Sequence, residues 1–172
     1  ASLDSNTNLT DEIKEKIYSL VKILNDKLKG INFDRLSKNL KTVQLGKIGV
    51  FEHKGSYEYD VIGNRILLSK RLNGNYDIDH VFMKAILEMA TSTGKFTGFS
   101  SDDRLRVLNL AYTEILANYV IGNEGDSDLE EEMLVTNLLS HIVGKDTSFN
   151  SYFSNNGDII IAAMQDSEVG LL

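Results

Sequence analysis

The chain has 172 residues, 42% of them hydrophobic, which is enough to bury one core and makes a single domain the default expectation. Its 25 acidic and 18 basic side chains give a formal charge of −7 with no Lys/Arg cluster, so nucleic acid is not an expected partner. The absence of cysteine excludes disulfides, thiolate zinc sites and a cysteine nucleophile.

Nothing in the sequence indicates a membrane or secretory destination. No stretch reaches the ~20 apolar residues of a membrane span, and residues 1–10 are polar, with neither a basic start nor an apolar run. We therefore expect a soluble, acidic protein without a membrane partner, cytoplasmic by default. Residues 1–9 are rich in Ser and Asn, and we expect them to be mobile ahead of one domain over residues 10–172.

Apolar side chains at helical spacing predict an amphipathic helix at the start of this domain. Thr10 is the expected N-cap, Asp11 and Glu12 complement the helix dipole, and Gly30 ends the pattern. The apolar positions are Ile13, Ile17, Leu20, Val21, Leu24 and Leu28.

Between residues 42 and 69 the pattern changes to short β-like runs. These runs cover residues 42–45, 48–53, 56–62 and 65–69, and they are separated by Gly46, Lys54-Gly55 and Gly63-Asn64. Such spacing favours antiparallel hairpins. Within residues 56–62, apolar or aromatic side chains alternate with polar ones, which is typical of a strand with one solvated face.

A mainly helical half follows. A second helix, capped by Asp77 or Asp79, is predicted to run to about residue 91, and a third from about residue 101 to Gly122. Ser127 with Glu130 forms a capping-box pattern that predicts a fourth helix ending at residue 144. Residues 146–164 predict two short helices, of which the second, with three isoleucines at 159–161, is alternatively a strand. Strands clustered early and helices clustered late indicate one α+β domain.

The second predicted helix contains Leu87-Glu88-Met89-Ala90-Thr91, and the third contains Glu114. With residues 64–68 before them and residues 142–145 and 152–153 after them, these helices resemble the zincin-type metallopeptidases that use a glutamate as third zinc ligand (gluzincins), in their small bacterial or phage form. The resemblance covers roughly residues 43–164. It implies a zincin-like α+β fold with an N-terminal helix, a small sheet containing antiparallel strands and a mainly helical C-terminal half.

In that family the first helix carries HExxH, which supplies two His ligands and a Glu general base, and the next helix supplies the Glu ligand. Here Glu88 keeps the base position and Glu114 the third-ligand position, but Leu87 and Thr91 replace both histidines. The resemblance therefore implies a vestigial site with no catalytic residue, bound metal or cofactor. We expect a catalytically inactive, zincin-like binding or structural module of a bacterial or phage assembly, with protein as its partner.

Two other interpretations of these residues stay open. Carboxylates such as Glu88 and Glu114 on amphipathic helices are most often solvated charges or partners of nearby Lys and Arg. They could instead serve a hydrolase, with or without a divalent metal ion, and an acid/base pair without metal would need them about 5 to 9 Å apart across a cleft.

The three histidines do not restore a metal site. His80 precedes Glu88 by eight residues, ~12 Å along a helix. His53 is expected in a strand and His141 near the end of the fourth helix. We expect all three to be structural or exposed. The sequence also contains no dinucleotide fingerprint, P-loop, nucleophile elbow or EF-hand loop.

Overall fold

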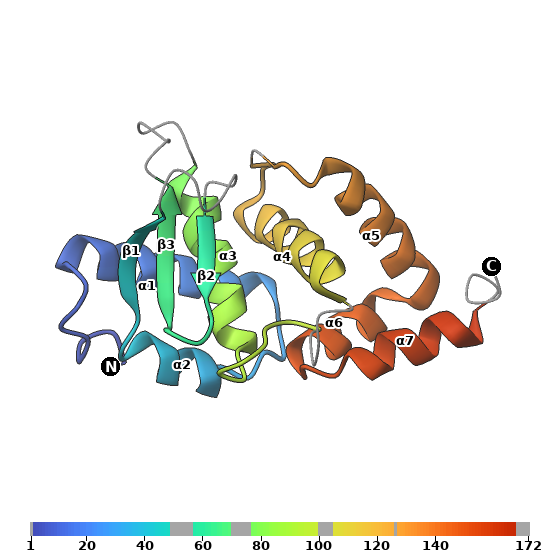
Figure 1. Cartoon of the computed structure of the whole chain (residues 1–172), viewed down its shortest axis with the longest axis horizontal. Helices are drawn as coiled ribbons and strands as arrows, with labels where there is room; N and C mark the ends of the chain where they lie inside the picture. The colour runs from blue at the N-terminus through green and yellow to red at the C-terminus, as the bar shows by residue number, and fades with distance from the viewer. Residues whose placement is uncertain (1, 49–56, 70–76, 100–104, 126, 168–172) are drawn as a thin grey trace.

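The computed structural model describes residues 2–48, 57–69, 77–99, 105–125 and 127–167. Within these residues the fold is α+β and mainly helical, as expected (Figure 1). The elements are α1 (Asp11–Lys27), α2 (Asp34–Leu40), β1 (Gln44–Ile48), β2 (Tyr57–Asp60), β3 (Arg65–Ser69), α3 (Ile78–Thr91), α4 (Arg106–Ile121), α5 (Glu130–Val143), α6 (Lys145–Phe153) and α7 (Gly157–Asp166).

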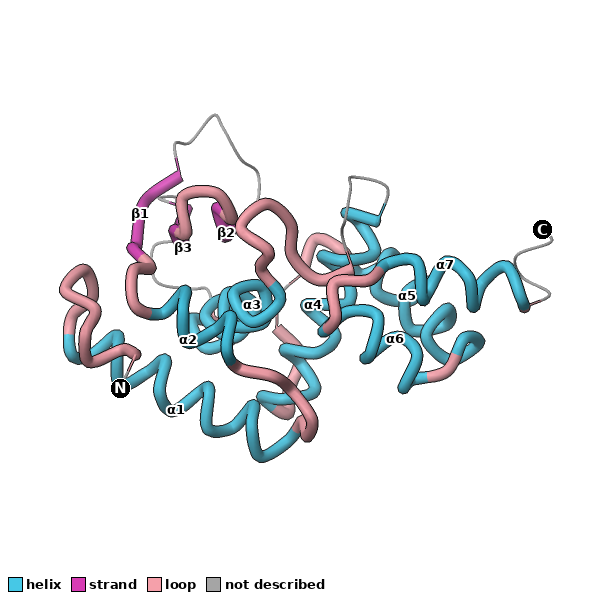
Figure 2. The backbone as a smooth tube through the Cα atoms, turned by 90° about the horizontal axis from the view of Figure 1, so that it is seen from below, coloured by secondary structure: helices cyan, strands magenta, loops and turns pink. Residues whose placement is uncertain are grey.

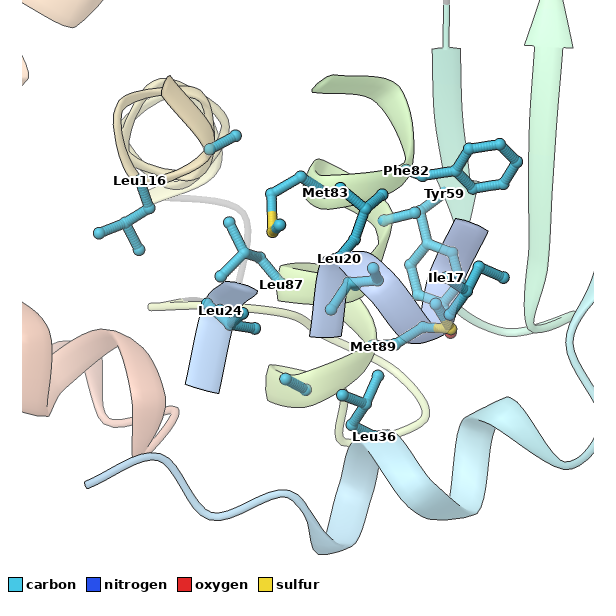
Figure 3. Close-up of a cluster of buried hydrophobic side chains, with 14 of the residues drawn as sticks. Ile17, Leu20, Leu24, Leu36, Tyr59, Phe82, Met83, Leu87, Met89 and Leu116 are labelled. Carbon is cyan, nitrogen blue, oxygen red and sulfur yellow. The ribbon is translucent and has the colours of Figure 1, made fainter. Parts of the chain in front are cut away.

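Helix α3 is the centre of the fold. It lies between the sheet on one side and α1 on the other, with α2 and α4 beside it and α5 to α7 beyond α4 (Figures 1 and 2). Most of its side chains are buried, which is typical of a helix that is apolar on nearly every face. Figure 3 shows the resulting core, in which Leu87 of α3 lies near Leu24 of α1 and Leu116 of α4.

The first helix forms as the sequence predicts. Thr10 is its N-cap, and its hydroxyl oxygen accepts a hydrogen bond of 3.3 Å from the Ile13 N–H. Ile17, Leu20 and Leu24 are buried, while the opposite face is solvated. The helix ends at Lys27, slightly before the predicted glycine, because the next residue, Leu28, already has extended backbone dihedrals.

The sheet has the order β1-β3-β2. Strands β2 and β3 pair in antiparallel fashion, with Tyr59 opposite Ile66, which confirms the hairpin predicted from residues 56–69. Strand β1 pairs with β3 in parallel, so the expectation of an antiparallel hairpin is wrong for this pair. Gly46, expected to separate two strands, instead lies inside β1, where a Cβ atom would come within 2.7 Å of Leu67. The strand predicted over residues 48–53 falls outside the described residues, except for its first residue.

Segment 2–9 is docked on the fold, in contrast to the mobility expected from its composition. Leu3 and Leu9 are buried. The buried Asn6 amide donates hydrogen bonds of 2.9 and 3.0 Å to the carbonyl oxygens of Leu40 and Val43. These two carbonyls lie between the end of α2 and the start of β1, so Asn6 satisfies backbone acceptors that would otherwise be unpaired. Helix α2 itself was not predicted, because seven residues are too short to establish a helical repeat.

The helices of the C-terminal half agree with the sequence patterns except at one cap. Asp77 caps α3, and α4 ends at Gly122, which has a left-handed φ of 91°. Ser127 lies two residues before the N-cap of α5, Leu129, and accepts a hydrogen bond of 2.9 Å from its N–H, so the predicted capping box is wrong. Residues 159–161 belong to α7, which excludes the strand alternative. The predicted start of the third helix near residue 101 lies outside the described residues.

Candidate functional site

Helices α3 and α4 lie antiparallel, as contacts at both ends show. At the start of α3, His80 Nε2 is 2.9 Å from the carbonyl oxygen of Asn123, which follows α4. At the other end, Asn109 near the start of α4 accepts a hydrogen bond of 3.1 Å from the N–H of Phe99, which follows α3. This packing puts Leu87, Glu88 and Thr91 on one helix and Glu114 on its neighbour.

Among the acidic side chains of the described residues, Glu88 has the most strongly shifted pKa. Its side chain is buried, and the Tyr57 hydroxyl of β2 donates a hydrogen bond to its Oε2. Burial raises the pKa of Glu88 to about 7, although the hydrogen bond from Tyr57 and the positive charge of Lys84 act in the opposite direction. Glu88 is therefore not the solvated charge that its residue type favours.

Glu114 has a different environment. Its Oε1 is 3.5 Å from the Nζ atom of Lys84, which lies one helical turn before Glu88 on α3, and both side chains of this ion pair are mostly buried. The same Nζ atom is 5.3 Å from the centre of the Tyr57 ring. Lys84 thus pairs with one carboxylate and lowers the pKa of the other. For Glu114, the interpretation as partner of a nearby Lys fits the structure.

The two positions that replace the histidines are part of the core. Leu87 is 0% exposed and packs between α1 and α4 (Figure 3). Thr91 is equally buried, and its hydroxyl donates to the Leu87 carbonyl at 3.0 Å and accepts from the Gly98 N–H at 2.8 Å. A leucine has no atom that can ligate zinc, and the Thr91 hydroxyl is already used in hydrogen bonds to the backbone. These residues therefore do not fit a tetrahedral zinc site. Among the described residues, no group of three or more His, Cys, Asp or Glu side chains could hold a metal ion.

A tyrosine from α6 completes the polar surroundings. Tyr152 is fully buried, and its hydroxyl is 2.6 Å from that of Thr113, the residue before Glu114. Burial is the main cause that raises the pKa of Tyr152, and the nearby charge of Glu88 adds to it, whereas hydrogen bonding to Thr113 and Thr91 lowers it. Hydroxyl groups from β2, α3, α4 and α6 therefore gather in the region of Glu88.

Sequence reasoning did not identify Tyr57, Lys84 or Tyr152 as members of this site. One signal was present: Glu88 interrupts the apolar run 85–90, and a carboxyl group buried in such a run needs a hydrogen-bonding partner. The identity of that partner was not available from local sequence, because Tyr57 lies 31 residues earlier in the chain.

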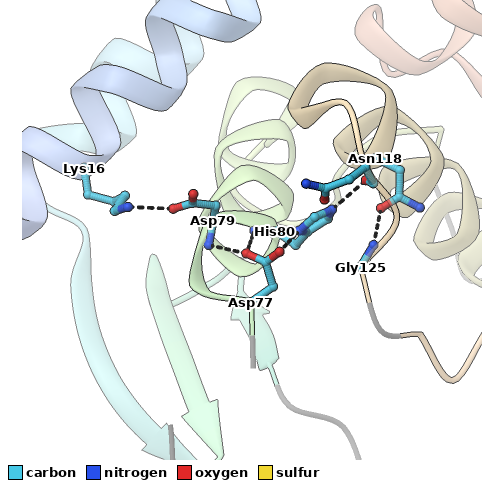
Figure 4. Close-up of polar contacts among 7 residues, drawn as sticks. Lys16, Asp77, Asp79, His80, Asn118 and Gly125 are labelled. Carbon is cyan, nitrogen blue, oxygen red and sulfur yellow. Dashed lines mark hydrogen bonds and ion pairs between the residues drawn. The ribbon is translucent and has the colours of Figure 1, made fainter. Parts of the chain in front are cut away.

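His80 and His141 take the structural and the exposed place expected of them. His80 is buried, with Nδ1 2.6 Å from Asp77 Oδ2 and Nε2 against the Asn123 carbonyl, so it ties the start of α3 to the end of α4 (Figure 4). The nearby Gly125 packs against its ring. His141 is exposed near the end of α5, and His53 lies outside the described residues.

Comparisons with protein-family models, curated proteins and solved structures found no match. In the part of the chain that is described, no helix combines the length and apolar character needed to cross a membrane.

Proposed function

We propose that this chain is a catalytically inactive, zincin-like domain that acts as a binding or structural module, with another protein as its partner. The observation that carries the proposal is the environment of the two side chains, Leu87 and Thr91, that replace the ligand histidines. Leu87 is packed inside the core, and the hydroxyl of Thr91 is used by backbone groups of its own helix and of Gly98. Neither side chain can therefore ligate a metal ion that would activate a water nucleophile.

The edge strand and the positions of Glu88 and Glu114 support the same proposal. The sheet has an antiparallel edge strand, β2, which contacts α3 through Tyr57 and Glu88. The next helix in the chain, α4, runs antiparallel to α3 and brings Glu114 to Lys84, one turn before Glu88. This sequence of elements agrees with the layout that the resemblance implies.

Lys84 explains how the buried carboxylates of such a domain can be stabilised without a metal ion. A carboxylate that loses a bound cation inside a protein needs a new positive partner or a proton. The ammonium group of Lys84 is that partner for Glu114, while Glu88 has a pKa of about 7 and a hydrogen bond from Tyr57. The polar cluster then serves to fix the helix pair and the edge strand.

One observation favours the alternative of a hydrolase. A carboxyl group with a pKa of about 7 is suited to general acid–base catalysis near neutral pH. The alternative also needs Glu114 as a second acid or base, but the Glu114 carboxylate is engaged by Lys84. We therefore rank the binding module first.

The proposal is tested by metal analysis and a peptidase assay on the purified protein, together with thermal unfolding in the presence of a chelator. We expect no stoichiometric zinc, no hydrolysis, and the same melting temperature with and without chelator. Stoichiometric zinc, or hydrolysis that the Glu88→Gln variant loses while it remains folded, would establish the hydrolase and refute the binding module.

A further inference from the structure

Both ring nitrogens of His80 face an oxygen atom. Nδ1 is shielded from solvent and lies 2.6 Å from Oδ2 of Asp77 (Figure 4). On the other side of the ring, Nε2 is 2.9 Å from the backbone carbonyl oxygen of Asn123. A carbonyl oxygen only accepts hydrogen bonds, so Nε2 must carry a proton. The protonation of Nδ1 therefore decides whether the ring is neutral or positively charged.

The surroundings of Asp77 show where the second proton lies. Its Oδ1 accepts hydrogen bonds from the N–H groups of Asp79 at 3.0 Å and His80 at 3.3 Å, as a helix N-cap does. Burial disfavours the charged form of this carboxyl group, but the His80 ring and these N–H groups outweigh burial and lower the pKa of Asp77. Asp77 is therefore a carboxylate that has only lone pairs to offer. At 2.6 Å a proton must lie between Oδ2 and Nδ1, and the ring holds it, so this geometry requires an imidazolium.

We propose that His80 is a pH-dependent clamp: as an imidazolium it holds the α4–α5 connection, residues 122–125, on the start of α3, and as a neutral ring it releases this connection. A neutral imidazole has one N–H and can serve only one of the two oxygen atoms. Asp77 keeps that N–H, because a hydrogen bond to a carboxylate is stronger than one to a neutral carbonyl group. The lone pair of Nε2 then faces the carbonyl oxygen of Asn123, and their repulsion separates the connection from the helix.

The α4–α5 connection packs directly on this ring. At Gly125 an added Cβ atom would come within 2.7 Å of the His80 ring, so the backbone of the connection lies close against it. The Gly125 N–H donates a hydrogen bond of 3.2 Å to the side-chain oxygen of Asn118 on α4. Asn123 and Glu124 are exposed, so a released carbonyl group can bond to water instead. The Gly125 N–H is therefore a local reporter of whether the connection lies on the ring.

The charged groups of the neighbouring helices are paired with one another. Asp79 is 2.7 Å from Lys16 of α1, on the other side of the start of α3 (Figure 4). Lys84, one turn after His80, is paired with Glu114 of α4. The charge that faces the ring at short distance is thus that of Asp77, the cap of its own helix.

The direction of the pH effect follows from the proton on Nδ1. The clamp is closed at low pH, and it opens as the pH rises through the range in which histidine side chains titrate, about pH 5 to 8. The inference goes beyond the proposed function and does not depend on it, since His80 lies about 12 Å along α3 from Glu88.

Hydrogen exchange of the Gly125 N–H, measured by NMR on the whole chain at about pH 5.5 and about pH 8, tests the clamp. Each rate is divided into that of an unstructured peptide at the same pH, which removes the intrinsic pH dependence of exchange. We expect this protection to fall roughly five- to tenfold at the higher pH, as the loss of one hydrogen bond produces. His80→Gln should remove the pH dependence, whereas His141→Gln, at an exposed histidine of α5, should keep it. Equal wild-type protection at both pH values, or an unchanged dependence in folded His80→Gln, overturns the proposal.

Asp77→Asn tests the role of the Nδ1 proton. The side-chain oxygen of Asn still caps α3, while its NH2 group takes the place of Oδ2 and donates to an unprotonated Nδ1. A neutral His80 ring then serves both neighbours, because its one N–H stays on the carbonyl oxygen of Asn123. We expect this variant to protect the Gly125 N–H at the higher pH as well as at the lower one. A folded Asp77→Asn variant that loses protection with pH as the wild type does contradicts the proposal.

Discussion

Replacing Glu88 by Gln should remove a pH dependence from the stability of the fold. The pKa of Glu88 is about 7 in the folded protein against an ordinary value of 4.5, because burial disfavours its charged form. The folded state therefore holds this proton more tightly than the unfolded chain, so the stability is highest at low pH and is lost as the pH rises from 4.5 through about 7. Well above pH 7, ionisation of the buried carboxyl group lowers the free energy of unfolding by about 3 kcal/mol in total. Between about pH 5 and pH 8.5 this loss grows by about 2.5 kcal/mol.

The assay is urea unfolding of the wild type and of Glu88→Gln at both pH values. Gln has nearly the same shape and can still accept the hydrogen bond from Tyr57. Its amide group introduces two new donors, and an unsatisfied buried donor costs about 1 to 3 kcal/mol at every pH, which cancels when the two pH values are compared. We expect the variant to gain about 2 to 3 kcal/mol relative to the wild type on going from about pH 5 to pH 8.5. If the difference in unfolding free energy between the two proteins is the same at both pH values, Glu88 is not a buried acid.

Further substitutions test the hydrogen bond to this acid and, separately, the close packing at residue 98. Tyr57→Phe removes a hydrogen bond that lowers the pKa of Glu88, so this pKa should rise further, as measured by NMR titration of a carboxyl-labelled sample; an unchanged or lower value would mean that the hydrogen bond is absent. Gly98→Ala should cost about 2 kcal/mol or more, because a Cβ atom there collides with the amide of Asn109 and φ is +59°, whereas Gly94→Ala, at φ +86° in open space, should cost only about 1 kcal/mol. Equal losses in these two variants, measured by urea unfolding, would contradict the close packing at residue 98.

The parts of the fold that were predictable depend on neighbours in sequence. Helix α1 and its cap at Thr10 follow from spacing and from one residue type at the right place. The β2–β3 hairpin also joins consecutive segments, through the turn at Gly63-Asn64, and Asn64 has a φ of 50° there. In these cases the chain carries the information within about 20 residues, which is the range that periodicity and turn chemistry can report.

The parts that were not predictable depend on contacts between distant segments. The parallel pairing of β1 with β3 skips the strand that lies between them in sequence, so no turn specifies it. The hydroxyl of Tyr152 reaches Thr113 across 39 residues, and Tyr57 reaches Glu88 across 31. The composition of the Ser/Asn-rich segment 2–9 predicts mobility, but the Asn6 amide donates hydrogen bonds to two carbonyl groups of the α2–β1 connection and so holds the segment in place. Composition reports neither the presence nor the direction of such bonds.

Restoring the missing ligands tests most directly whether this chain has a vestigial gluzincin-type site. In the variant Leu87→His with Thr91→His, residues one turn apart share a helix face, so the two imidazoles could reach one zinc ion at about 2.0 to 2.1 Å, with Glu114 as third ligand and water as fourth. Because Leu87 is fully buried, its replacement could cost about 2 to 5 kcal/mol, so circular dichroism must first establish that the variant is folded. In calorimetric titrations with zinc, we predict stoichiometric binding by the folded double variant and weaker binding after a further Glu114→Ala change. A folded double variant that binds no zinc, or binds it equally well without Glu114, would contradict the assignment of these positions.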